Sequence, residues 1–283
     1  MKTNMKTDMK KVLTIAGSDC SGGAGIQADL KTFAAHGTYG MSVIVSVVAE
    51  NTSRVIDLQN VSPGMIHKQM EAVFEDIPPD AVKIGMLSAP ECMRAVAEAL
   101  SEYNPPNVVL DPVMYAKNGA PLMDPAAVDT LIKEVLPLAR VLTPNIPEAE
   151  EITGRRIETP ADMALAAEAL CGMGCQAAVV KGGHRTGAAL DVLWEKSPVS
   201  DGHHMHSFES QRLPTKNTHG TGCTFSSAIA ARLARGLPLV EAVRQAKEYV
   251  TAAIAHSLNI GRGHGPTHHF YAFERFFQEK ETL

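Results

Sequence analysis

The chain has 283 residues, a formal net charge of −5 and 45% hydrophobic residues. This length suffices for one large domain or two small ones with a sizeable buried core. The mild negative charge, without a long run of lysine and arginine, argues against nucleic acid as the main partner.

Cysteine usage and the N-terminus indicate where the protein works. The five cysteines are irregularly spaced and do not suggest a disulfide framework, which favours a reducing compartment. The N-terminus is polar and lysine-rich, unlike a secretory signal, and the chain has no run of about 18 apolar residues. We therefore expect a cytoplasmic protein without a membrane span. A flexible tail is expected over residues 1–10 and a single domain over residues 11–283.

Short apolar runs alternate with amphipathic helical patterns along the chain. Predicted strands cover residues 12–17, 41–49, 81–86, 107–111, 141–145 and 177–183. Predicted helices cover residues 26–36, 63–75, 89–103, 125–140 and 160–173, and another begins near Pro147. Two extended segments, 190–194 and 206–213, frame a polar turn over residues 200–204 in the manner of a hairpin. Strands that alternate with helices predict an α/β fold whose mostly parallel sheet is covered on both faces.

Residues suited to ligand binding fall at the ends of the predicted strands. In open sheets of this kind, ligands bind beyond the carboxyl ends of the strands. The residues that share this position are Gly17, Glu50, Met86, Asp111, Asn145 and Lys181. Their convergence predicts a binding site at this edge of the sheet.

A polar turn over residues 217–224 leads into an alanine-rich helical segment, 225–235. The first amides of a helix lack intrahelical partners and its dipole is positive there, which makes an anion site. Gly220 and Gly222 allow close approach of the anion because they carry no Cβ. Cys223 lies in the first helical turn, where the same field is expected to lower the pKa of the thiol. The alternative is an ordinary helix cap with a buried structural cysteine.

A glycine-rich loop over residues 17–25 joins the first predicted strand to the first helix. Its spacing does not match the Rossmann G-x-G-x-x-G pattern. It also lacks the G-K-[ST] of a Walker loop, because no lysine follows Gly25 until Lys31. A loop that admits a small ligand close to its backbone fits better. Asp29, on the following helix, either orients this loop or is an exposed helix acid.

A series of short motifs carries a family resemblance. They are LTIAGSD (13–19), SGGAGIQADLKT (21–32), VAENT (48–52), KIGML (83–87), DPVM (111–114), TPNIPEA (143–149), KGGH (181–184), the 217–224 turn and GPTHHF (265–270). In this order they resemble the ribokinase-like small-molecule kinases, and within them the hydroxymethylpyrimidine and phosphomethylpyrimidine kinases of thiamine biosynthesis. The resemblance covers roughly residues 11–272. It implies a three-layer α/β/α sandwich, a homodimer, ATP and Mg²⁺. It also implies phosphorylation of 4-amino-5-hydroxymethyl-2-methylpyrimidine and then of its monophosphate.

The same resemblance implies roles for individual residues. The turn would hold the transferring phosphoryl group with the amides of Gly220, Thr221, Gly222 and Cys223, and the cysteine would also serve as base. The acids that would bind Mg²⁺ are Asp111 and Glu148. The residues on the nucleotide side are Lys181, Asn145 and Thr218. The walls around the pyrimidine would be formed by Gly17, Ala24, Met86 and Val113.

Simpler structural roles remain open for several of these residues. Asp111 could be a helix cap, and Asn145 and Glu148 could cap the helix near Pro147. Lys181 could be an ordinary surface lysine.

Glu50 is the predicted reader of the pyrimidine. A 4-aminopyrimidine presents an exocyclic N–H donor beside a ring-nitrogen acceptor. A carboxylate satisfies the donor but repels the acceptor, unless the acid or the ring carries a proton. Burial would favour the protonated acid. The alternative is a solvated acid at a strand end.

Three other functions compete with the pyrimidine kinase. A pyridoxal kinase of vitamin B6 salvage has a closely similar frame, although the segment 49–52 favours the pyrimidine enzyme. A non-catalytic pyrimidine-binding protein on the same fold is the second. A cysteine hydrolase is the third. It would need an activating base near Cys223. His219 is close in sequence, but a Gly-Thr-Gly turn is expected to aim amides rather than an imidazole at the pocket.

Two further expectations concern the segment between the sixth strand and the turn. The region 181–213 is the predicted cover over the nucleotide, because such covers exclude water. His203, His204 and His206 are expected in an exposed hairpin turn rather than in a metal site.

Overall fold

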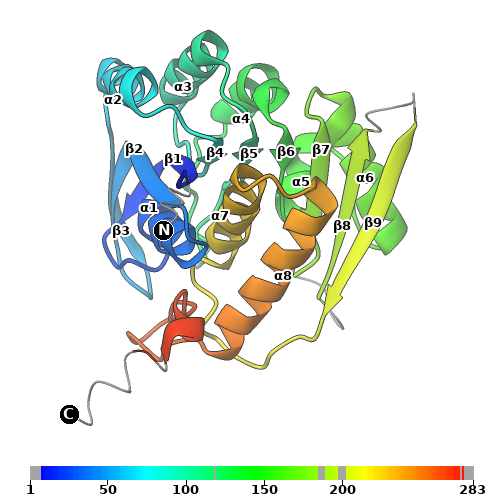
Figure 1. Cartoon of the computed structure of the whole chain (residues 1–283). Coiled ribbons are helices and arrows are strands. Elements are labelled where there is room, and N and C mark those ends of the chain that lie inside the picture. Colours follow the sequence, from blue (N-terminus) through cyan, green and yellow to red (C-terminus); the bar gives the residue numbers. More distant parts are fainter. Residues whose placement is uncertain (1–7, 118, 184–188, 197–201, 275, 277–283) are drawn as a thin grey trace, which may run out of the picture.

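The computed structural model describes residues 8–117, 119–183, 189–196, 202–274 and 276, and within them nine strands form one sheet (Figure 1). The strands are β1 (Lys11–Asp19), β2 (Tyr39–Glu50), β3 (Val55–Asn60), β4 (Ala81–Ile84), β5 (Val108–Leu110), β6 (Val141–Leu142), β7 (Ala177–Lys181), β8 (Ala189–Lys196) and β9 (His203–Ser210). Their order is β3-β2-β1-β4-β5-β6-β7-β8-β9. Strands β2, β1, β4, β5, β6 and β7 pair in parallel, and β3, β8 and β9 are antiparallel additions at the two edges. The predicted mostly parallel sheet is confirmed.

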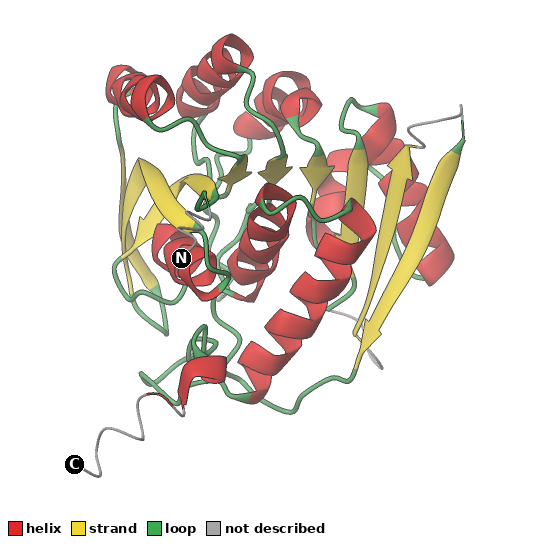
Figure 2. Ribbon diagram, viewed as in Figure 1, coloured by secondary structure: helices red, strands yellow, loops and turns green. Residues whose placement is uncertain are grey.

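Helices cover both faces of this sheet (Figures 1 and 2). One face carries α2 (Pro63–Asp76), α3 (Pro90–Tyr103), α4 (Ala127–Thr130), α5 (Ile146–Thr153) and α6 (Pro160–Gly172). The other carries α1 (Gly25–Ala35), α7 (Thr221–Ala234) and α8 (Leu239–Ala255). Successive residues of a strand point to opposite faces, so Leu13 packs in the core under α2 and α3 while Val12 packs under α7 and α8. The predicted three-layer sandwich is confirmed.

Some elements differ from those predicted. The segment 125–140 is not one regular helix: α4 continues into a π-helical turn η1 (Leu131–Val135) and a 3₁₀ turn η2 (Leu136–Leu138). Strand β3 and helix α8 were not predicted. A short 3₁₀ turn, η3 (Tyr271–Phe273), lies close to the C-terminus.

The hairpin of β8 and β9 is confirmed, but its second strand begins earlier than expected. His203 and His204 lie within β9 rather than in the turn, and the ring of His203 stacks on Trp194 of β8 at a centroid distance of 5.1 Å. The turn residues 197–201 and most of the predicted N-terminal tail lie outside the described residues. No described helix is both long and apolar enough to cross a membrane.

Candidate active site

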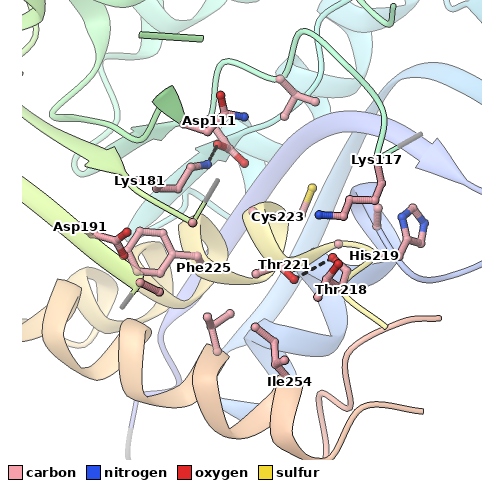
Figure 3. Close-up of a pocket in the computed structure, with 18 of the residues that line it drawn as sticks. Asp111, Lys117, Lys181, Asp191, Thr218, His219, Thr221, Cys223, Phe225 and Ile254 are labelled. Carbon is pink, nitrogen blue, oxygen red and sulfur yellow. Dashed lines mark hydrogen bonds and ion pairs between the residues drawn. The ribbon is translucent and has the colours of Figure 1, made fainter. Parts of the chain in front are cut away.

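One cavity of about 650 Å³ lies at the carboxyl edge of the parallel strands (Figure 3). It is lined by predicted site residues from separate parts of the chain: Ala24, Glu50, Asp111, Val113, Asn145, Glu148, Lys181 and the turn residues Thr218, Gly220, Thr221, Gly222 and Cys223. Gly17 and Met86 are not among the residues that line it. They pack against each other instead, since a Cβ on Gly17 would lie 2.5 Å from Met86 Cε. Their contact with the pyrimidine therefore remains a prediction.

The turn before α7 presents its amides to this cavity. Gly220 has a φ of 75°, in the left-handed region, and a Cβ there would lie 1.8 Å from the carbonyl oxygen of Gly23. The hydroxyl of Thr221 donates to the Thr218 carbonyl at 2.7 Å and closes the turn. α7 begins at Thr221, and its first residues line the cavity, so the unpaired amides at this helix start make an anion site there.

Cys223 behaves differently from the expectation. Burial raises the pKa of its thiol to about 11, even though the Lys83 charge and a hydrogen bond from the Gly25 amide act in the opposite direction. The predicted lowering of the pKa is wrong because withdrawal from water outweighs the favourable charges. Cys223 is a protonated thiol at neutral pH.

Asp111 and Lys181 form an ion pair across two strand ends. Lys181 Nζ lies 2.7 Å from Asp111 Oδ1, and Asp111 also accepts from Thr143 Oγ1 at 3.1 Å and from Ser226 Oγ at 3.3 Å. The Asp111 side chain is almost fully buried. Lys181 is therefore not an ordinary surface lysine, because it compensates a buried carboxylate.

Asn145 and Glu148 form a capping box at the start of α5. The Glu148 amide donates to Asn145 Oδ1 at 2.9 Å, and the Asn145 amide donates to Glu148 Oε2 at 2.8 Å. Burial raises the pKa of Glu148 to about 7, with the nearby charge of Lys181 opposing the shift and that of Asp111 adding to it. The capping role is thus present, and it holds the buried Glu148 close to Asp111.

Glu50 is the last residue of β2 and lies next to the glycine-rich loop, where Cys20 Sγ donates to its carbonyl oxygen. Burial raises the pKa of Glu50 to about 7, and the negative charge of Asp19 adds to the shift. The side chain is half-buried, so the solvated alternative does not describe it. A carboxyl group of this pKa is available in its protonated form near neutral pH.

Asp19 and His219 link the glycine-rich loop to the turn, a contact that the sequence did not indicate. Asp19 Oδ2 lies 2.9 Å from His219 Nε2 and accepts from the amides of Gly23 and Ala24 at 3.0 and 2.7 Å. Although burial alone would raise it, the hydrogen bonds from His219 and the loop hold the pKa of Asp19 well below its usual range. His219 is also among the residues that line the cavity, and its imidazole is engaged with Asp19.

Asp19, Glu50 and His219 bring three potential metal-ligand atoms within 4.8 Å of one another. Asp19 Oδ2 already accepts three hydrogen bonds, however, and Oδ1 accepts from the Ser21 amide at 2.7 Å. The Asp19 carboxylate therefore organises the loop through these hydrogen bonds.

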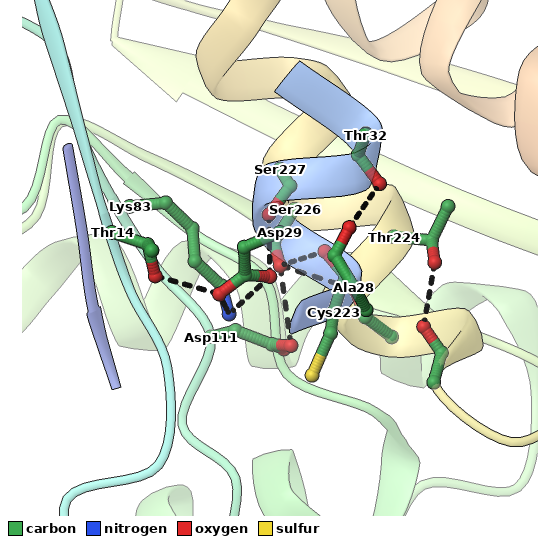
Figure 4. A network of polar contacts seen from close by, with 12 residues as sticks. Thr14, Ala28, Asp29, Thr32, Lys83, Asp111, Cys223, Thr224, Ser226 and Ser227 are labelled. Carbon is green, nitrogen blue, oxygen red and sulfur yellow. Dashed lines mark hydrogen bonds and ion pairs between the residues drawn. The ribbon is translucent and has the colours of Figure 1, made fainter. Parts of the chain in front are cut away.

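A buried ion pair supports the site from below (Figure 4). Lys83 Nζ lies 2.9 and 2.8 Å from the two carboxylate oxygens of Asp29, and both side chains have no exposed surface. Asp29 also accepts from Thr14 Oγ1 at 2.6 Å and from Ser227 Oγ at 2.7 Å. These contacts join β1, β4, α1 and α7 beneath Cys223. Asp29 is thus not an exposed helix acid.

The loop after β5 forms another wall of the cavity, of which only Val113 was predicted. It folds back on itself through a bridge between Tyr115 and Pro121, and it contributes Lys117 to the lining. The predicted cover also borders the cavity, through Gly183 and the segment 210–213, while residues 184–188 and 197–201 of it lie outside the described residues.

The fold and this site together define a small-molecule kinase of the ribokinase-like class. The structure matches a pyridoxal kinase of Bacillus subtilis, solved as an ADP complex, with a TM-score of 0.84 and 38% identity, covering 93% of this chain and 98% of that one. It matches phosphomethylpyrimidine kinase of Clostridium difficile 630 with a TM-score of 0.76 and 48% identity, covering 87% of this chain and 99% of that one.

Sequence comparison gives the family. Residues 19–268 match the model of the family described as phosphomethylpyrimidine kinase, and the chain belongs to this family. It is 48% identical over 269 residues to the hydroxymethylpyrimidine/phosphomethylpyrimidine kinase of Haemophilus influenzae, covering 95% of this chain and 99% of the relative. It is 50% identical over 264 residues to the thiamine biosynthesis bifunctional protein ThiED of Geobacter sulfurreducens, of which it spans 53%. The resemblance drawn from the motifs is confirmed.

Proposed function

We propose that this chain transfers the γ-phosphoryl group of ATP to 4-amino-5-hydroxymethyl-2-methylpyrimidine, and then to the resulting monophosphate, in thiamine biosynthesis. The names of its relatives support this reaction. The observation that carries it is one cavity that contains both a helix N-terminus for a phosphoryl group and Glu50 for an aminopyrimidine.

Phosphoryl transfer depends on positioning and charge neutralisation more than on covalent chemistry. The amides of the turn from Gly220 to Cys223 would hold the phosphoryl group as negative charge moves toward the leaving oxygen. Lys181, Asn145 and Thr218 would face the nucleotide, because they lie around the same cavity beyond the turn.

The acceptor hydroxyl would lie over Cys223. A thiol whose pKa is about 11 is a weak base at neutral pH, so we assign it to orienting the hydroxyl rather than to early removal of its proton. A loose transition state makes little demand on a base before the leaving bond breaks. The acceptor proton would leave late, as the new bond forms.

Asp111 and Glu148 are the acids that would hold a magnesium ion. Both are buried acids, and burial, with a smaller addition from the charge of Asp111, raises the pKa of Glu148 to about 7. Lys181 is paired with only one of them, Asp111. Mg²⁺ prefers one or two carboxylates together with water and phosphate oxygens. When bound, it would neutralise the phosphate charge. Chelation by EDTA is expected to abolish turnover, and added Mg²⁺ is expected to restore it.

The pyrimidine ring would contact Glu50 at its amino edge, with Ala24 and Val113 beside it. Gly17 and Met86 would form the wall behind them. We further propose that the protein is cytoplasmic and forms a homodimer. Light scattering on the purified chain would test the homodimer through its molar mass.

Pyridoxal phosphorylation is the second candidate, because the match to the Bacillus subtilis pyridoxal kinase has a TM-score of 0.84. The deciding experiment measures ADP release with the hydroxymethylpyrimidine and with pyridoxal side by side. We expect a higher kcat/KM for the pyrimidine. A higher value for pyridoxal would transfer the assignment to vitamin B6 salvage, and binding without ADP release would favour a non-catalytic protein.

A further inference from the structure

Most lysines that line the cavity are already paired with an acid. Lys181 Nζ lies 2.7 Å from Asp111, and Lys247 Nζ lies 2.7 Å from Asp191. Lys117 differs from them: no carboxylate of the described residues forms an ion pair or a hydrogen bond with it. It is an uncompensated positive charge at the site.

Lys117 faces the reacting end of the cavity. Its loop follows β5 and is closed by the bridge between Tyr115 and Pro121. Figure 3 shows the ammonium nitrogen extending from this loop toward Cys223 and the turn before α7. The residue is exposed overall, but partial withdrawal of the ammonium from water lowers its pKa. An anion bound beside it would offset that desolvation.

The two reactions of the proposed function place different charges at this point. In the first, a neutral hydroxyl meets the γ-phosphoryl group. In the second, the acceptor is a phosphate monoester, which carries about −1.5 to −2 charges near pH 7. One of its oxygens forms a bond to the γ-phosphorus, the bond from that phosphorus to the bridging oxygen breaks, and ADP leaves with the electron pair. No proton has to be removed, but two anionic groups must be brought together.

The residues assigned to the transferring γ-phosphoryl group cannot also bind the phosphate of the acceptor. The turn amides face the transferring group, and Lys181 is paired with Asp111. The acceptor phosphate therefore needs a separate cation on the Cys223 side of the cavity. Lys117 is the unpaired lysine there among the described residues.

We propose that Lys117 binds the phosphate of the monophosphate acceptor and thereby selects for the second phosphorylation. The inference rests on the proposed function and adds a residue that distinguishes its two substrates. Removal of a charge-assisted hydrogen bond to a phosphate is expected to lower kcat/KM for that substrate roughly 10- to 100-fold.

The test compares both acceptors in the full chain. Initial rates for the alcohol and for the monophosphate are measured by chromatographic separation of the products, together with the KM for ATP. In Lys117→Gln we expect kcat/KM to fall roughly 10- to 100-fold for the monophosphate and less than about threefold for the alcohol. Lys117→Arg, which keeps the charge, should recover most of the loss. Lys68→Gln, an exposed lysine on α2, is the matched control.

Three outcomes would overturn the inference and leave the proposed function intact. Equal losses for both acceptors would assign Lys117 to general packing of the loop. A raised KM for ATP with both acceptors would assign it to the nucleotide. Unchanged kinetics would show that it contacts no substrate. A wild-type chain that phosphorylates neither acceptor would overturn the proposed function and this inference with it, whereas the other outcomes leave the function intact.

Discussion

Substitution of Glu50 provides the sharpest test of how the site would recognise the pyrimidine. The raised pKa of about 7 means that the carboxyl group is largely protonated at pH 6 and largely ionised at pH 8. A protonated acid both accepts from the exocyclic amine and donates to the ring nitrogen, as an amide side chain also does. Glu50→Gln is therefore expected to bind the hydroxymethylpyrimidine nearly as well as the wild type. Glu50→Leu removes both hydrogen bonds from a half-buried position.

The expected magnitude follows from the burial of this group. Unsatisfied polar groups cost about 1–3 kcal/mol, so Glu50→Leu should weaken binding by roughly 5- to 150-fold. If only the protonated acid binds, the wild-type dissociation constant should rise about tenfold between pH 6 and pH 8, because the protonated fraction falls as pH passes the pKa. In Glu50→Gln the same change of pH should have little effect.

Isothermal titration calorimetry with the pyrimidine alone measures these constants without turnover. Glu98→Gln, an exposed acid on α3, controls for a general loss of negative charge. Wild-type affinity in Glu50→Leu would refute the assignment of Glu50 as reader. A large loss in Glu50→Gln would show that the ionised carboxylate meets a protonated pyrimidinium ring instead.

Three other substitutions test the remaining parts of the site. Lys83→Met leaves Asp29 buried without its partner and should lower the free energy of unfolding by about 3–5 kcal/mol in urea titrations, with partial recovery in the double variant Lys83→Met/Asp29→Leu. Wild-type stability of Lys83→Met would show that the ion pair with Asp29 does not stabilise the fold. Cys223→Ser should lower kcat while the dissociation constant of the pyrimidine stays unchanged, and full turnover would reassign the thiol to packing. Gly220→Ala forces a Cβ to within 1.8 Å of the Gly23 oxygen and should cost roughly 100-fold in kcat/KM. Wild-type kinetics there would show that the turn position is unimportant.

The sequence was informative wherever the physical signal is local. Apolar runs followed by glycine or a polar residue located the parallel strands, and the Gly220 turn located the start of α7, because strand burial and helix ends depend on neighbouring residues. Helix α8 carries such a signal too, since its buried residues recur every three or four positions. Strand β3 is mostly exposed and alternates weakly, so its pairing with β2 defines it more than its own composition does.

The contacts that set protonation and charge could not be predicted in this way. Asp29 and Lys83 are 54 residues apart, and Asp19 and His219 are 200 apart, so no local spacing indicates either pair. The thiol pKa of Cys223 was predicted in the wrong direction for the same reason. Its position at a helix N-terminus is visible in the sequence, whereas its burial depends on how α1, α7 and β4 pack.

The link between the glycine-rich loop and the turn before α7 explains how this site could meet the geometric demand of phosphoryl transfer. The Gly23 carbonyl occupies the space that a Cβ on Gly220 would fill, and the same loop hydrogen-bonds through Asp19 to His219, the residue before that glycine. The glycine-rich loop and the amides of this turn therefore cannot shift independently. Reacting atoms must approach to about 3–3.5 Å, and an error of 1 Å costs about 100-fold in rate. Direct contact between the two segments fixes that separation in the folded chain, so substrate binding does not have to establish it.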